Sequence, residues 1–236
     1  MSVADKLIII AENEPKVYEA GKQKGIEQGI EQGIEQGKGI GKNEYLKTFC
    51  ERGLTELVIP EGISTLGDYA FYYQTKLKEL KLPEGLKEIK PYAFRGCDIR
   101  QFNLPNSLEI IGNFVFSTNY QLGWHIPLIL PSNLKTIGNS AFAYTHIWQE
   151  EFIFPASVET IGANAFVSTF KTYTSNTPDK KNKRIIFKGT PTSIANNAFQ
   201  GALTEDIYCP WPEGAVANAP WGATAATIHY NYTEEE

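Results

Sequence analysis

The chain has 236 residues, of which 42% are hydrophobic and 21% are charged. This composition is ordinary for a soluble globular protein, and the length suffices for one sizeable core or for an elongated array with a short appendage. The net charge is −5 and the Lys and Arg residues do not gather in one block, which argues against nucleic-acid binding through a basic patch.

The sequence predicts neither a signal-peptide core nor a membrane span near residue 1. The apolar run Leu7–Ile10 has four residues, whereas a signal-peptide core needs ~7–15. No apolar run in the chain approaches the ~18 residues of a membrane-spanning helix. We therefore expect no membrane span, and synthesis in the cytoplasm without a signal peptide.

Residues 1–45 differ in kind from the rest of the chain. Apolar positions follow a 4-3-4-3 step typical of a short coiled coil, although Glu14 occupies one of them and Pro15 interrupts the run. The segment GIEQGIEQGIEQGKGIG follows, and each Gly in a helix costs ~1 kcal/mol relative to Ala. We expect an N-terminal helical or low-complexity segment that oligomerises or tethers the protein. The alternative is a flexible spacer.

Residues 46–204 are predicted to contain six copies of one repeat. The first five copies have a proline eleven residues before a terminal phenylalanine, and these prolines are separated by 23, 22, 26 and 24 residues. Self-similarity at such a period is typical of a solenoid. The copies are IPEGISTLGDYAF (59–71), LPEGLKEIKPYAF (82–94), LPNSLEIIGNFVF (104–116), LPSNLKTIGNSAF (130–142), FPASVETIGANAF (154–166) and the degenerate FKGTPTSIANNAF (187–199).

Each repeat has a strand, a corner and a closing aromatic residue. Leu80 and Leu82 are two residues apart, as in a strand with one face buried, and Pro83 follows them. A Gly such as Gly112 suits a corner that needs a positive φ or a close backbone approach. No single repeat can bury its apolar residues alone. The phenylalanines at positions 71, 94, 116, 142, 166 and 199 are therefore predicted to stack as one ladder across the repeats.

The consensus LxxLxLPxxLxxIGxxAF resembles the BspA-like leucine-rich-repeat family over residues 54–199. The resemblance implies a right-handed solenoid with a short parallel sheet, poor in helix. Members of this family occur widely as surface or secreted adhesins, so the resemblance also implies protein or glycan binding. The opening residues and the C-terminal tail are similar to segments of prophage-linked proteins, which suggests a phage-tail or virion association.

Residues 205–236 are predicted to form a C-terminal cap. Ile207–Cys209 and Thr227–Tyr230 have the character of short strands. The end of a solenoid needs an atypical element that covers its last apolar layer. Trp211 and Trp221 are interpreted as part of that cap; the alternative is a pair that stacks on a ligand.

The sequence offers no catalytic constellation, metal cluster or cofactor motif. The three histidines accompany no nucleophile motif, and the three cysteines are far apart without CxxC spacing. We interpret the cysteines as reduced thiols; the alternatives are a disulfide or a zinc site. The expectation is a protein that is not an enzyme.

The candidate binding surface lies on repeats four and five. Outward strand positions there are isoleucines where the first repeats have charged residues such as Lys81. The segments that enter these strands carry aromatic side chains, and apolar and aromatic groups exposed together mark contact surfaces. The alternative is that longer loops bury these rings. The candidate residues are Tyr120, Trp124, His125, Ile126, Ile129, Tyr144, His146, Trp148 and Ile153.

The sequence thus favours a module that binds a protein or a cell-surface glycan in an adhesin or receptor-recognition role, and that forms homo-oligomers through residues 1–45. The alternative is an intracellular bacterial scaffold or regulatory interaction protein.

Overall fold

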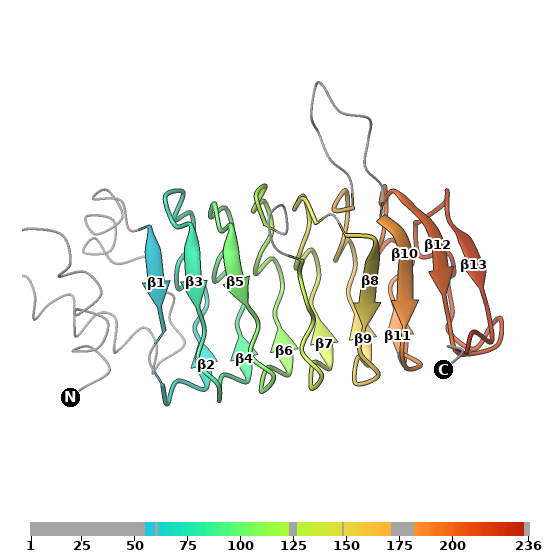
Figure 1. Ribbon diagram of the computed structural model, residues 1–236, viewed down its shortest axis with the longest axis horizontal. Coiled ribbons are helices and arrows are strands. Elements are labelled where there is room, and N and C mark those ends of the chain that lie inside the picture. The colour runs from blue at the N-terminus through green and yellow to red at the C-terminus, as the bar shows by residue number, and fades with distance from the viewer. Residues whose placement is uncertain (1–54, 60, 123–126, 148, 171–181, 234–236) are drawn as a thin grey trace, which may run out of the picture.

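The computed structural model describes residues 55–59, 61–122, 127–147, 149–170 and 182–233. These residues form thirteen strands and no helix. The chain winds in about seven stacked turns, which run in order from β1 to β13 (Figure 1). The predicted solenoid is confirmed, while the predicted N-terminal helical segment, residues 1–45, lies outside the described residues.

Two walls of the solenoid are made of strands, and every pairing among the described strands is parallel. One wall contains a three-stranded sheet and a four-stranded sheet, and the other wall is a single six-stranded sheet. The first wall consists of β1 (Glu56–Val58), β3 (Glu79–Lys81), β5 (Gln101–Asn103), β8 (Glu151–Phe154), β10 (Asn182–Phe187), β12 (Thr204–Tyr208) and β13 (Thr227–His229). The second wall consists of β2 (Thr65–Leu66), β4 (Glu88–Ile89), β6 (Ile110–Ile111), β7 (Thr136–Ile137), β9 (Thr160–Ile161) and β11 (Ser193–Ile194).

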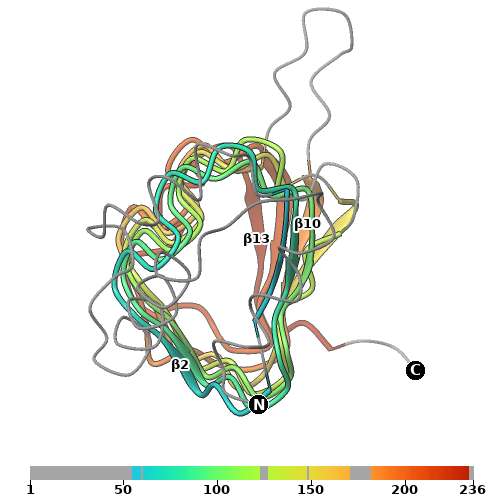
Figure 2. The same ribbon diagram turned by 90° about the vertical axis from the view of Figure 1, so that its left-hand side faces the viewer.

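The register places equivalent residues of consecutive repeats side by side. Leu57 pairs with Leu80, and Leu80 pairs with Phe102, so one inward-facing ladder crosses β1, β3 and β5. Residues on either side of such a position face outward because side chains alternate along a strand. Viewed along the solenoid, the turns superimpose around a single core (Figure 2).

The predicted phenylalanine ladder is confirmed. The six rings stack on one another with centroid separations between 5.2 and 5.7 Å, and all six are buried. The turns that carry them lie across the core from the sheet that contains β10 and β13 (Figure 2). Backbone bonds link these turns: the Phe94 N–H donates to the Val115 C=O (3.1 Å), and the Phe116 N–H donates to the Ala141 C=O (2.8 Å).

The corner glycines are needed for close approach of successive turns. A Cβ on Gly138 would lie 2.6 Å from the carbonyl carbon of Gly112, and one on Gly162 would lie 2.6 Å from the Asn139 backbone nitrogen. Neither residue is among those with positive φ. These glycines are therefore required by the close approach of a neighbouring backbone, and not by a positive φ.

The C-terminal strands extend the parallel wall instead of ending it. Asp206 pairs with Thr227 and Tyr208 pairs with His229, so β13 adds to β12 in register. The rings of Trp211 and Trp221 are buried, with centroids 6.4 Å apart, and both contact the Phe187 ring. Their interpretation as packing groups of the C-terminal end is confirmed, and the ligand-stacking alternative is wrong.

Candidate binding surface

Five of the nine predicted surface residues belong to the described part of the chain. They are Tyr120, Ile129, Tyr144, His146 and Ile153, while Trp124, His125, Ile126 and Trp148 lie outside it. The five residues fall into two groups, one on a strand wall and one in the turns.

The isoleucine group lies on the outer face of the first wall. Ile129 is 76% exposed and Ile153 is 40% exposed, although both are large apolar residues. Each stands between buried neighbours, as Phe152 and Phe154 show for Ile153 in β8. Strand alternation directs Ile153 to solvent. Ile129 has the equivalent place in its repeat, in a segment that forms no strand.

The second group consists of aromatic residues in the turns. Tyr120 is 54% exposed and Tyr144 is 50% exposed. The Tyr120 ring contacts the His146 ring at a centroid distance of 5.9 Å and an angle of 51°. Burial lowers the pKa of His146 below its ordinary value, while a hydrogen bond to the Tyr120 backbone acts in the opposite direction. The imidazole is therefore neutral at neutral pH and suits a partly apolar contact.

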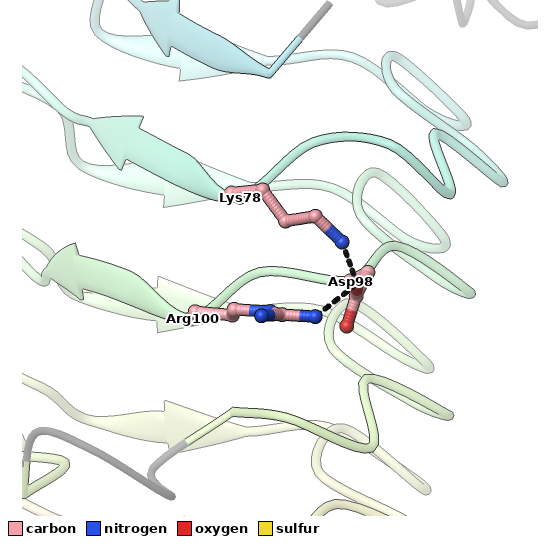
Figure 3. Close-up of polar contacts among 3 residues, drawn as sticks. All are labelled: Lys78, Asp98 and Arg100. Atoms are coloured by element: carbon pink, nitrogen blue, oxygen red, sulfur yellow. Dashed lines mark hydrogen bonds and ion pairs between the residues drawn. The ribbon is translucent and has the colours of Figure 1, made fainter. Parts of the chain in front are cut away.

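Around β1, β3 and β5, the outer face of the first wall carries charged side chains that form ion pairs with one another. Asp98 accepts from both Lys78 and Arg100, the latter at 3.2 Å, just before β3 and β5 (Figure 3). Lys81 donates to Glu56 at 2.6 Å across β1 and β3, and that hydrogen bond raises the pKa of Lys81. Exposed pairs of this kind add little stability. This part of the outer face is therefore polar, and its charges offset one another. Further along the same wall, the outer face exposes isoleucine.

Sequence reasoning missed that the register of the first wall continues to the C-terminus. Ile153 pairs with Ile186, Ile186 with Tyr208, and Tyr208 with His229. Ile186 is buried, with 3% exposure, so the exposed positions are interrupted between Ile153 and Tyr208. The Tyr208 and His229 rings stack at 4.5 Å, and His229 Nε2 lies 2.7 Å from Asp206 Oδ1. Because Tyr208 and His229 have no repeat motif around them, only their strand register reveals that they extend the isoleucine positions.

The described residues hold no group of three or more His, Cys, Asp or Glu side chains that could bind a metal ion. Cys97 and Cys209 are buried, and burial raises the pKa of the Cys209 thiol to about 12. Such a thiol is not a nucleophile at neutral pH. Within the described ranges, no helix has the length and apolar character needed to cross a membrane.

The stacked parallel turns, each built from one repeated motif, define the class of solenoid repeat proteins. The family profile described as "BspA type Leucine rich repeat region" matches residues 43–173 in six copies. The chain belongs to this BspA-type leucine-rich-repeat family.

Solved structures share the fold. The pneumococcal vaccine antigen PcpA is 21% identical with a TM-score of 0.54, and the match covers 78% of this chain and 43% of that one. The leucine-rich-repeat protein of T. pallidum is 22% identical with a TM-score of 0.51, over 66% of this chain and 72% of that one. The chain thus matches less than half of the length of PcpA. A search of curated proteins gave no match.

Proposed function

We propose that this protein is a non-enzymatic recognition module with an adhesin or receptor-binding role. It uses two surface regions, the exposed isoleucines Ile129 and Ile153 on the first wall and the aromatic residues Tyr120 and Tyr144 in the turns. The observation that carries the proposal is the 76% exposure of Ile129, which lies two residues before the proline of its repeat, as the exposed Ile153 does in the next repeat. Folding does not require isoleucine at these positions, because β3 and β5 carry Lys81 and Asn103 there.

The chemistry of this surface suits a protein or a cell-surface glycan. Tyrosine and histidine rings present an apolar body with a polar edge, and both kinds of partner use such groups. Tyr120 and Tyr144 offer large exposed rings, and the neutral His146 adds no charge that would need to be desolvated. We expect contact through apolar and ring surfaces supplemented by hydrogen bonds.

Immobilised mucin, before and after enzymatic removal of its glycans, tests the proposal with the full chain. The variant Ile129→Ser with Ile153→Ser, and the variant Tyr120→Ala with Tyr144→Ala, are expected to lose binding while they keep their urea midpoints. The matched control is Lys81→Ser with Asn103→Ser, which changes the same strand position in the polar half. Binding that survives deglycosylation indicates a protein partner, and binding that disappears indicates a glycan. Equal binding by all three variants contradicts the proposed surface.

We further propose that residues 1–45 assemble several copies of the solenoid. The 4-3-4-3 pattern of apolar residues supports this, because a helix so rich in glycine is marginal without a partner. Assembly would convert weak single sites into a multivalent array. Light scattering is expected to give a larger assembly for the full chain than for residues 46–236, with the shorter chain still folded. Identical subunit numbers would contradict the proposal.

The resemblance of both ends of the chain to prophage-linked proteins supports a tail-associated location. Tail and lysis genes beside the gene for this protein are the expected finding. Metabolic or regulatory neighbours would contradict this location and favour the intracellular scaffold.

A further inference from the structure

A second surface feature lies on the turns, away from the sheet with the exposed isoleucines. Two residues before each ladder phenylalanine, the first three repeats have Tyr69, Tyr92 and Phe114, with φ values of 58°, 64° and 58°. The next two repeats have Ser140 and Asn164, with φ values of 53° and 55°. The five backbones have the same shape, so aromatic residues are not required to form the turn.

This backbone shape disfavours aromatic residues. The left-handed region is uncommon for side chains other than glycine, is relatively well tolerated by Asn, and is a real outlier for bulky residues. Asn164 is thus the residue that folding alone would favour. Residues kept in a disfavoured conformation cluster at functional sites. The backbone conformation alone therefore does not account for the rings in the first three repeats.

The rings form one continuous row, in which Tyr69 and Tyr73 are exposed and the others are half-buried. Tyr69 stacks on Tyr92 at 4.6 Å, and Tyr92 stacks on Phe114 at 4.9 Å. Tyr72 contacts the edge of Tyr69 at 5.4 Å and lies 4.7 Å from Tyr73. Tyr69 is 37% exposed and Tyr73 is 52% exposed.

The stacking distinguishes between kinds of partner. Both faces of the Tyr92 ring are covered by its neighbours, so the row presents ring edges and hydroxyl groups to solvent. Sugars pack their C–H groups on open ring faces, and the Tyr92 ring at the centre of the row has none. Protein interfaces, in contrast, are enriched in tyrosine and arginine at their centres.

The cation that contacts the row favours an acidic partner. The Arg95 guanidinium lies 5.7 Å from the Tyr92 centroid and 5.5 Å from the Phe114 centroid. Within the described part of the chain, no carboxylate pairs with Arg95, whereas Lys78 and Arg100 share Asp98. Together with the tyrosine hydroxyls, the Arg95 guanidinium provides hydrogen-bond donors for a partner.

We propose that this tyrosine face, formed by Tyr69, Tyr72, Tyr73, Tyr92, Phe114 and Arg95, is a docking surface for an acidic segment of a partner protein. This tyrosine face is separate from the exposed isoleucines, so a negative result for one proposal does not contradict the other.

Random peptides displayed on phage and selected on the full chain provide the test. The matched variant is Tyr69→Asn with Tyr92→Asn and Phe114→Asn, which installs the residue that occupies the same position in the fifth repeat. We expect the selected peptides to be rich in Asp and Glu, and their binding to weaken with salt. Binding should fall at least tenfold in the Asn variant and severalfold in Arg95→Gln, and it should be unchanged in the control Asn164→Ser.

The Asn variant should also keep or raise the urea midpoint, because it relieves backbone strain. A lowered midpoint would show that the rings serve packing, and would overturn the proposal. Failure to select acidic peptides, or equal binding by the Asn variant, would overturn it too. Binding to a glycan array that disappears in the Asn variant would also overturn it, because the partner would then be a sugar and not a protein.

Discussion

The first three turns and the turns from β8 onward share one core but differ on both of their outer faces. In the first three turns, the sheet face is polar and ion-paired while the turn face is aromatic. From β8 onward, the sheet face carries Ile153 and Tyr208, while the turn face carries Asn164. The solenoid thus constrains its inward positions in every turn and leaves the outward ones free. Surface chemistry that changes along such a constant scaffold points to binding, since folding does not demand the change.

The largest effect should come from the shared core. Replacing Phe116 by Ala is expected to cost ~3–5 kcal/mol of unfolding free energy, because a buried ring stacked on both sides is lost. Phe71→Ala should cost less, since the described ladder begins at Phe71 and that ring stacks only on Phe94 within it. Urea unfolding of both variants provides the measurement. An unchanged midpoint for Phe116→Ala would contradict the register of the repeats.

An intermediate effect is expected from the polar side chains inside the turns. Asn119 is buried and donates to the C=O groups of Phe94 (2.8 Å) and Phe116 (2.9 Å). Replacing Asn119 by Leu removes these hydrogen bonds and should cost about 1–3 kcal/mol.

Thr169→Val provides the comparison for Asn119→Leu. The Phe142 C=O that accepts from Thr169 at 2.6 Å also accepts from the Thr145 hydroxyl at 2.7 Å, so a donor remains. Urea unfolding should therefore show a smaller loss for Thr169→Val. A larger loss for Thr169→Val would contradict this reasoning.

The smallest effect should come from the surface ion pairs. The hydrogen bond between Lys135 and Glu109, 2.7 Å long, lowers the pKa of Glu109 and raises that of Lys135. Because the folded-state pKa of Glu109 is depressed, its contribution is present above the ordinary value near 4.5 and is lost as the pH falls through the lowered pKa. For Lys135 the contribution is present below 10.5 and is lost as the pH rises through the raised pKa.

Lys135→Ala should accordingly lower the urea midpoint slightly at neutral pH, and less so with added salt. The difference from the unmodified chain should vanish in strong acid. A difference that persists after Glu109 is protonated would assign the effect to packing of the lysine stem.

The sequence alone determined the solenoid, its parallel strands and its phenylalanine ladder. Every turn must satisfy the same packing against its neighbours, so the constraint is repeated along the chain and is visible as a periodic motif. Outward residues carry no such repetition. Ile129 and Ile153 could be recognised only because they differ from Lys81 and Asn103, the polar residues at the same position in the second and third repeats.

The tertiary structure alone decided the rest. The strained aromatic row of Tyr69, Tyr92 and Phe114 depends on φ values and ring distances that no motif records. The neighbours of Tyr208 depend on the register between β10, β12 and β13, because strands far apart in sequence meet only when the turns stack.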